Sequence, residues 1–233
     1  MAMASSQVWL KRIRNIIGFM GMILPWIALF GAYMVSKSVC IPSAFWDNLS
    51  ISATYYITPA LTGILTTAAV VLMCYDGYEL KDDIVTTLSG VCGLMIVLFP
   101  CNCAVSPERV GLFQLSANVS HIIHCVSAVC FFLLLAYNSL FLFTEGTENP
   151  TKQKKTRNTI YRVCGVGMLV ALILMPLPIK FYAKTFIVET IALTFFGISW
   201  LVKGQVFGLF ADKSDDNSPK PSNIGEFMKN GKP

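Results

Sequence analysis

Six long stretches of the sequence carry very few charged residues, and this feature constrains the fold more than any other. A helix rises about 1.5 Å per residue, so about 20 residues are needed to cross a hydrocarbon core of about 30 Å. The stretches reach or approach this length at residues 16–35, 54–75, 84–101, 117–143, 160–179 and 181–202. We therefore predict an all-α fold, a six-helix transmembrane bundle that crosses the bilayer several times.

The composition of the chain supports the same conclusion. Charged residues make up 13% of the sequence and hydrophobic residues 55%, with a mean hydropathy of +0.61. Soluble domains carry about 25% charged residues. A surface so poor in charge excludes a water-soluble enzyme and a nucleic-acid partner, and it makes the lipid bilayer the first partner that we expect.

Small residues recur within the apolar stretches. In lipid, such residues allow two helix backbones to approach closely. The positions where we expect this role are Gly18, Gly21, Ser89, Gly93, Gly165 and Gly167.

The distribution of basic residues predicts the orientation of the bundle, because cytoplasmic loops carry an excess of Lys and Arg. With a cytoplasmic amino terminus and six crossings, 14 of the 18 basic residues fall on the cytoplasmic side. The other four are Lys37, Arg109, Lys180 and Lys184. We predict that both termini are cytoplasmic and that the membrane is the bacterial cytoplasmic (inner) membrane.

The chain divides into three parts by composition. We predict a cytoplasmic amino-terminal segment at residues 1–15, a six-span transmembrane domain at residues 16–203 and a flexible cytoplasmic tail at residues 204–233. The tail is rich in Ser, Asp, Asn, Pro and Lys, a composition that does not support a packed core.

Polar side chains from four predicted helices converge on one level near the outer face. Ionisable groups inside a bilayer cost a few kcal/mol and rarely face lipid, so each is a functional candidate. His124 and Glu189 both lie about 10 Å below the outer ends of their helices. The candidate pocket residues are Ser52, Tyr55, Tyr56, Asn102, His121, His124 and Glu189.

Two interpretations of this pocket stay open. In the functional one, His124 and Glu189 form a proton-relay pair or ligate a metal, and the serine and the two tyrosines are their hydrogen-bonding partners. In the structural one, His124 and Glu189 satisfy each other as a link between helices, and the tyrosines belong to the interfacial aromatic belt. We predict no cofactor; the alternative is zinc held by His121, His124 and Glu189, which would leave an open catalytic position.

A second polar cluster is expected at the inner face, where an acidic loop and a basic loop meet. Its members are Asp76, Asp82, Asp83, Arg157 and Arg162. The structural interpretation pairs Asp82 or Asp83 with one of the two arginines, and acidic residues also favour the start of a helix. The functional alternative is a cytoplasmic cation gate or a handle for a substrate.

The eight cysteines fall into two groups. Five lie within the apolar stretches, where a thiol behaves as a small hydrophobic group. Cys40, Cys101 and Cys103 lie on the outer side, so Cys40 is a candidate for a disulfide with Cys101 or Cys103 if that side is oxidising. The pair Cys101 and Cys103 alternatively offers two soft ligands for a metal such as Cu(I).

Several short strings together resemble a bacterial family of small multi-pass membrane proteins known only as a domain of unknown function. They include Ser52-x-x-Tyr-Tyr-x-Thr-Pro59, Tyr75-x-Gly-Tyr78 with Asp82 and Asp83, Leu98-Phe-Pro100, His124-x-x-Ser-Ala128, Arg157-Asn158 with Tyr161, and the run 197–204. The resemblance covers roughly residues 15–205. Such families are similar in layout to membrane hydrolases that include alkaline ceramidases, which use a Ser, an Asp and three His around zinc. This chain has two His in all.

Three functional hypotheses follow. The first is binding or transport of a small polar or amphipathic molecule in the outer pocket. The second is a lipid-active membrane hydrolase that uses His124 and Glu189, with or without a metal. The third is a non-catalytic membrane subunit or scaffold, whose helices pack against a protein partner.

Overall fold

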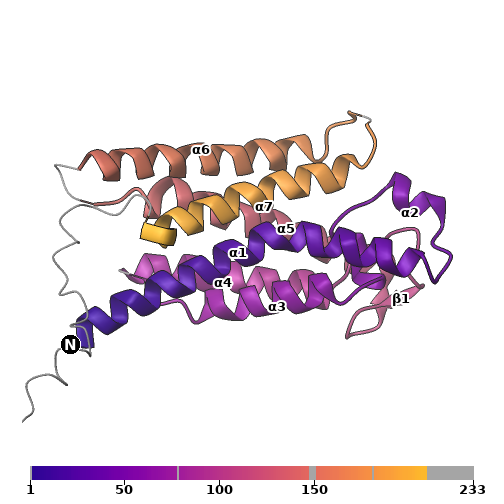
Figure 1. The fold of residues 1–233 in the computed structure, drawn as a ribbon. Helices are drawn as coiled ribbons and strands as arrows, with labels where there is room; N and C mark the ends of the chain where they lie inside the picture. Colours follow the sequence, from indigo (N-terminus) through magenta and orange to yellow (C-terminus); the bar gives the residue numbers. More distant parts are fainter. Residues whose placement is uncertain (1, 78, 147–150, 180, 209–233) are drawn as a thin grey trace, which may run out of the picture.

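The computed structural model describes residues 2–77, 79–146, 151–179 and 181–208, and it is mostly helical (Figure 1). Its long helices are α1 (Ala2–Ser36), α3 (Ala60–Met73), α4 (Leu80–Leu98), α5 (Ala117–Tyr137), α6 (Lys152–Leu174) and α7 (Lys184–Lys203). They lie roughly along one common axis (Figure 1). The predicted helical class is therefore confirmed.

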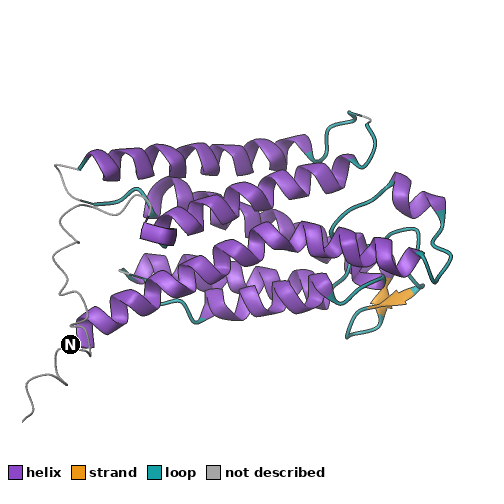
Figure 2. Cartoon of the chain, viewed as in Figure 1, coloured by secondary structure: helices purple, strands orange, loops and turns teal. Residues whose placement is uncertain are grey.

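Short elements cap this arrangement and cluster mainly at one end of it (Figure 2). They are α2 (Ser43–Asp47), the 3₁₀ helix η1 (Ser52–Tyr56), the π-helix η2 (Asn138–Leu142), the 3₁₀ helix η3 (Val206–Gly208), and the strands β1 (Arg109–Val110) and β2 (Leu115–Ser116). The two strands pair antiparallel, with Arg109 opposite Ser116 and Val110 opposite Leu115. This small hairpin is the one departure from the predicted all-α class within the described residues.

The long helices form a ring in the order of the sequence. Each of them packs against the next one along the chain, from α1 through α3, α4, α5 and α6 to α7, and α7 packs back against α1. The interior of the ring is filled by buried apolar side chains such as Ile17, Leu72, Leu135, Met168 and Trp200.

Four helical segments are long and apolar enough to cross a membrane, which indicates an integral membrane protein. They are Val8–Ser36, Ala117–Leu142, Lys152–Leu174 and Lys184–Lys203. Helix α3 is apolar but has only 14 residues. Helix α4 has 19 residues, but Lys81, Asp82 and Asp83 lie in its first turn.

The outer surface of the ring is apolar as well. On α1, exposed large apolar side chains recur at Ile16, Phe19, Ile23, Phe30 and other positions of the same helical face. Similar exposed side chains occur on the other long helices, for example Val126 on α5 and Val166 on α6. A continuous apolar exterior of this kind is unfavourable in water and is matched to lipid.

Several predicted boundaries differ from the observed ones, for local reasons. The predicted stretch 54–75 is not one helix, because η1 ends before Pro59 and α3 begins after it. Proline disfavours helical geometry in the residue before it but suits the start of a helix. Helix α4 ends at Leu98, two residues before Pro100. The predicted boundary at residue 15 falls inside α1, and residues 209–233 of the predicted tail lie outside the described part.

The contact between α1 and α7 depends on two glycines that face each other. A methyl group added at Gly197 would lie 2.7 Å from the carbonyl oxygen of Gly18, and one added at Gly18 would lie 2.9 Å from the carbonyl oxygen of Gly197. Both distances are shorter than a carbon–oxygen contact allows. The two backbones can therefore approach this closely only where both residues lack a side chain.

We predict that Gly197→Ala destabilises the protein, because the added methyl forces α7 away from α1. Overpacking of this kind costs about 1–3 kcal/mol. The matched control is Gly63→Ala on α3, where an added methyl meets nothing within 4 Å. Thermal unfolding of the purified protein should show a lower midpoint for Gly197→Ala and no loss for Gly63→Ala; equal midpoints would contradict the role of this contact.

Candidate functional site

A cavity of about 530 Å³ lies at the end of the bundle that carries α2 and the hairpin. Its walls come from α2, η1, the loop between α4 and β1, and helices α5, α6 and α7. Five of the predicted pocket residues line it, namely Ser52, Asn102, His121, His124 and Glu189. The structure thus brings together side chains that are up to 137 positions apart in the sequence.

Glu189 of α7 is held by the segment that leads into η1. The backbone N–H of Ile51 donates to its Oε2 at 2.5 Å, and Oε1 lies 3.3 Å from the hydroxyl of Ser52. One turn earlier on α7, the N–H of Phe186 donates to the carbonyl of Leu49 at 3.1 Å. Helix α7 is therefore fixed to this segment by both backbone and side-chain hydrogen bonds.

His124 of α5 is buried and is bonded through both ring nitrogens. Its Nδ1 lies 3.1 Å from the carbonyl oxygen of Ile96 and 2.9 Å from that of Phe99, at the end of α4. Its Nε2 lies 3.0 Å from the hydroxyl of Ser52. His124 and Glu189 thus meet at the same level, as expected, but they meet through Ser52 and not directly.

The remaining predicted pocket residues have different surroundings. His121 is exposed, and its Nδ1 accepts a hydrogen bond of 3.3 Å from the backbone N–H of Asn102. Tyr55 and Tyr56 do not line the cavity; their rings pack edge to face, and the Tyr56 hydroxyl donates to the carbonyl of Cys101 at 2.7 Å. The predicted role of the tyrosines as partners of His124 and Glu189 is not what the structure shows.

Several residues that the sequence did not single out complete the cavity. Phe45 of α2, Val129 and Phe132 of α5, and Leu172 and Met175 of the α6 end give it an apolar wall. These side chains look like ordinary apolar residues in the sequence, so no local signal marks them. The N–H of Ile51, which binds Glu189, belongs to the backbone and carries no sequence signal at all.

Among the described residues, no group of three or more His, Cys, Asp or Glu side chains is placed to hold a metal ion. His121 and His124 share a face of α5, but Glu189 approaches Ser52 and Ile51. Zinc at His121, His124 and Glu189 and Cu(I) at Cys101 and Cys103 stay predictions.

The outer cysteines are free thiols in the structure. Cys40 is exposed, whereas Cys101 is buried and Cys103 is partly buried in the cavity wall. The Cys101 thiol and the backbone N–H groups of Val105 and Ser106 donate to the Cys103 sulfur, and these bonds lower the pKa of Cys103 to about 7. Disulfide pairing of Cys40 stays a prediction.

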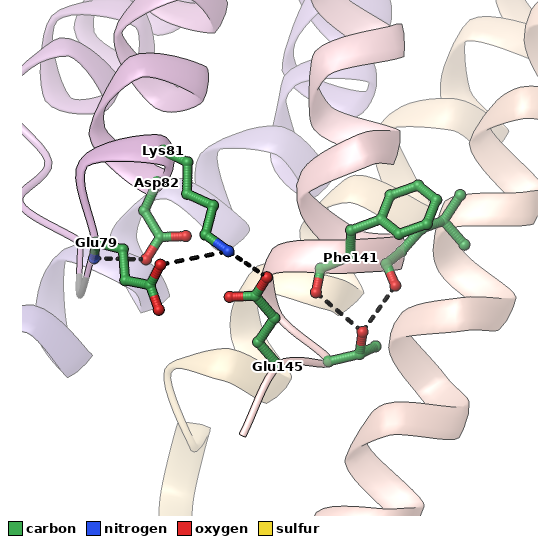
Figure 3. Close-up of polar contacts among 7 residues, drawn as sticks. Glu79, Lys81, Asp82, Phe141 and Glu145 are labelled. Atoms are coloured by element: carbon green, nitrogen blue, oxygen red, sulfur yellow. Dashed lines mark hydrogen bonds and ion pairs between the residues drawn. The ribbon is translucent and has the colours of Figure 1, made fainter. Parts of the chain in front are cut away.

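The opposite end of the bundle carries the ion pairs. Lys81 of α4 lies 2.7 Å from Glu145, which follows η2, and 3.3 Å from Glu79 (Figure 3). Glu79 and Asp82 form a capping box at the start of α4, in which the Asp82 carboxylate accepts from the Glu79 N–H (Figure 3). The exposed Lys81–Glu145 pair joins the α3–α4 connection to the end of η2.

The predicted inner cluster is only partly assembled. Asp82 and Arg157 line one cavity of about 360 Å³ at this end. Asp83 instead accepts a hydrogen bond of 2.6 Å from the N–H of Gly77, and Asp76 and Arg162 are exposed. The Asp83 carboxylate is thus bonded within its own loop, and the pairing of Asp82 or Asp83 with Arg157 or Arg162 stays a prediction.

The cavity at this end is lined by more basic than acidic side chains among the described residues. Its charged members are Lys11, Arg14, Lys154, Arg157, Lys203, Glu79, Asp82 and Glu145. Arg14 is buried, and its Nε donates to the hydroxyl of Tyr75 at 2.9 Å. Such a wall does not favour the cation gate that was one interpretation of this cluster.

Comparison of the chain with family models, with curated proteins and with solved structures gives no match. The resemblance to a bacterial membrane family therefore stays a hypothesis, and the functional argument depends on the geometry of the sites.

We predict that Cys103 reacts with iodoacetamide as a thiolate with a midpoint near pH 7. A lowered pKa means that the reactive form is lost only below about pH 7, and about half of it is present at that pH. The rate should be followed by mass spectrometry of the Cys103 peptide across pH. In Cys101→Ala the midpoint should rise, since the thiol donor is lost; an unchanged midpoint would contradict this account.

Proposed function

We propose that the chain is a six-span protein of the bacterial cytoplasmic membrane, with both termini on the cytoplasmic side. In this arrangement α3 and α4 complete the ring begun by the four long apolar segments, and η1 with its flanking residues extends α3 toward the outer face. The charged cavity then faces the cytoplasm, and the cavity at Ser52, His124 and Glu189 faces outward. The excess of basic residues at the inner end supports this orientation.

We further propose that the outer cavity binds or transports a small amphipathic molecule. The observation that carries this proposal is a cavity of about 530 Å³ that is lined by both polar and apolar side chains. Its polar members include Ser52, His124 and Glu189, and its apolar members include Phe132 and Leu172. Pockets that bind small molecules combine a mostly apolar lining with a few polar groups that fix orientation.

A second candidate function is the lipid-active hydrolase, which one contact favours. The Ser52 hydroxyl lies 3.0 Å from Nε2 of His124, and backbone carbonyls hold Nδ1 of the same ring. A serine beside an oriented imidazole is the arrangement of a nucleophile and its base. In such a reaction Ser52 Oγ would attack the carbonyl carbon of an ester while His124 Nε2 takes its proton. The ester C–O bond would then break as His124 returns that proton to the leaving alcohol, and water would release the acyl group from Ser52. The two candidates differ in the fate of the bound molecule: a binding or transport protein releases it unchanged, and a hydrolase cleaves it.

The orientation predicts opposite labelling of two native cysteines. Cys40 follows α1 and Cys74 follows α3, and both are exposed. A membrane-impermeant maleimide applied to intact cells should label Cys40 and should reach Cys74 only after permeabilisation. Cys40→Ser and Cys74→Ser assign the labelled bands. Labelling of both residues in intact cells, or of Cys74 alone, would exclude the proposed topology.

The cavity predicts a variant that blocks binding. Ala128 lines the cavity on α5, whereas Val126 of the same helix is 59% exposed on the outer surface. Ala128→Phe should abolish the stabilisation that ten-carbon amphiphiles give to the protein in nanodiscs, and Val126→Phe should retain it. The probes are decyltrimethylammonium, decanoate and decanol, read by thermal unfolding.

The probe experiment has two contrary outcomes. If no probe stabilises the wild type more than Ala128→Phe, the cavity is not a binding site for amphiphiles. If the wild type instead cleaves a decyl ester that Ala128→Phe leaves intact, as mass spectrometry of the mixture would show, the hydrolase is the better account.

A further inference from the structure

The hydrogen bonds of the outer cavity form one chain from Glu189 through Ser52 to His124. Ser52 Oγ lies 3.3 Å from Glu189 Oε1 and 3.0 Å from His124 Nε2. Each end of the chain is also bonded to the backbone, Glu189 by the N–H of Ile51 and His124 Nδ1 by the carbonyls of Ile96 and Phe99.

A count of hydrogens shows what this chain requires. A carbonyl can only accept, so Nδ1 of His124 carries a hydrogen. Ser52 has two partners but supplies one hydrogen, so the second bond needs a hydrogen from Glu189 or from His124 Nε2. Without a ligand, both hydrogen bonds of Ser52 can therefore form only if Glu189 and His124 together hold one dissociable proton, besides the hydrogen on Nδ1.

Two arrangements of that proton satisfy every bond with the same heavy-atom positions. In the neutral one, protonated Glu189 donates to Ser52, and Ser52 donates to His124 Nε2. In the charged one, His124 Nε2–H donates to Ser52, and Ser52 donates to the Glu189 carboxylate. Transfer between them reverses two donors and moves no side chain, and it leaves the Nδ1 hydrogen in place.

The charge of the wall indicates what could replace this proton. Among the residues that line the cavity, Glu189 is the one carboxylate and none is Lys or Arg. The other titratable residues of the wall are His121, His124, Cys101, Cys103 and Cys125. Lys184, five positions before Glu189 on α7, directs its ammonium to the carbonyls of Met175 and Leu177. A deprotonated Glu189 is thus left without a cationic partner from this wall.

We propose that the cavity takes an amphipathic organic cation in exchange for one proton of the Glu189–Ser52–His124 chain. This inference rests on the proposed function and names its ligand class. A cation at Glu189 Oε1 satisfies the carboxylate, so Ser52 can give its one hydrogen to His124 Nε2 and the second hydrogen is no longer needed. One cation enters and one proton leaves to water, so the net charge of the site is unchanged.

The remaining walls suit the rest of such a ligand. Phe45 and Phe132 place aromatic rings in the lining, and such rings attract ammonium groups, while Val129, Leu172 and Met175 give an apolar surface for an alkyl or aryl part. A bare inorganic cation has no apolar part to bury against Val129, Leu172 and Met175. The site therefore selects charge and apolar surface together.

The test is calorimetric titration of the protein in nanodiscs with decyltrimethylammonium, with decanol as the neutral probe of equal chain length. Ala128→Phe serves as the baseline for partition into lipid. Titration in two buffers of different ionisation heat gives the number of protons released, and the wild type should release about one per cation. Its affinity for the cation should rise by up to about tenfold per pH unit while the site is protonated. Decanol should release none.

The matched variant is Glu189→Gln, whose amide can donate to Ser52 and accept from Ile51 as protonated Glu189 does. It should lose at least about tenfold in cation affinity and all proton release, which corresponds to at least about 1.4 kcal/mol. Retained decanol binding shows that the cavity is intact. If this variant does not fold, the proton count on the wild type decides the matter alone.

The outcomes separate the two proposals. Cation binding without proton release, or equal affinity for the cation and decanol, overturns the exchange and leaves the binding function. Binding of decanol or decanoate without binding of the cation also overturns the exchange and leaves the binding function. If no probe binds above the Ala128→Phe baseline, both proposals fall.

Discussion

A carboxyl group inside an apolar bundle must be hydrogen-bonded, and the way in which Glu189 meets this demand organises the end of the molecule that carries α2 and the hairpin. Leaving such a group unsatisfied costs several kcal/mol. The N–H of Ile51 and the hydroxyl of Ser52 are its partners, so the segment before η1 is held against α7. That segment leads into the short helix η1, and α3 begins only at Ala60. Ser50 and Ser52 of this irregular stretch line the cavity.

The two ends of the ring differ in how their polar side chains are satisfied. At the end that carries the connection between α3 and α4, charged side chains lie against one another, and exposed pairs such as Lys81 with Glu145 contribute about 0–1 kcal/mol. At the end that carries α2 and the hairpin, His124 and Glu189 are hydrogen-bonded to neutral partners, namely backbone groups and a serine. No Lys or Arg among the described residues lines the cavity at this second end. The proposed binding of an organic cation would therefore bring a positive charge to Glu189.

The sequence allowed the helical class and the level of the site to be predicted, because both follow from distances along single helices. Apolar length gave the helices, and the count from each helix end placed His124 and Glu189 at one height. The close approach at Gly18 was also predictable, since small residues mark it, although its partner Gly197 was not named. These inferences need only the rise per residue of a helix and the thickness of the bilayer.

Contacts between distant segments could not be predicted in the same way. Nothing local indicates that Ser52 stands between His124 and Glu189, because that position depends on how the chain turns before Pro59. The N–H of Ile51 has no residue type to recognise. The bond from the N–H of Gly77 to Asp83 was not predicted either, because the charge of Asp83 suggested an arginine partner and a backbone donor has no residue type to recognise. Asp side chains often bond to backbone groups close by in the sequence.

The position of Ser52 changes how the imidazole and the carboxylate should be understood. A direct contact between them would form a simple ion pair, whose only response to a ligand is to break. With one hydroxyl between them, the pair can exchange a proton without moving apart, and the carboxylate stays open to the cavity on its remaining side. The serine thus joins two groups with different surroundings: His124 is fixed by the carbonyls at the end of α4, whereas Glu189 is held by the N–H of Ile51 and also lines the cavity. This division explains why a buried histidine and a partly exposed glutamate belong to one site.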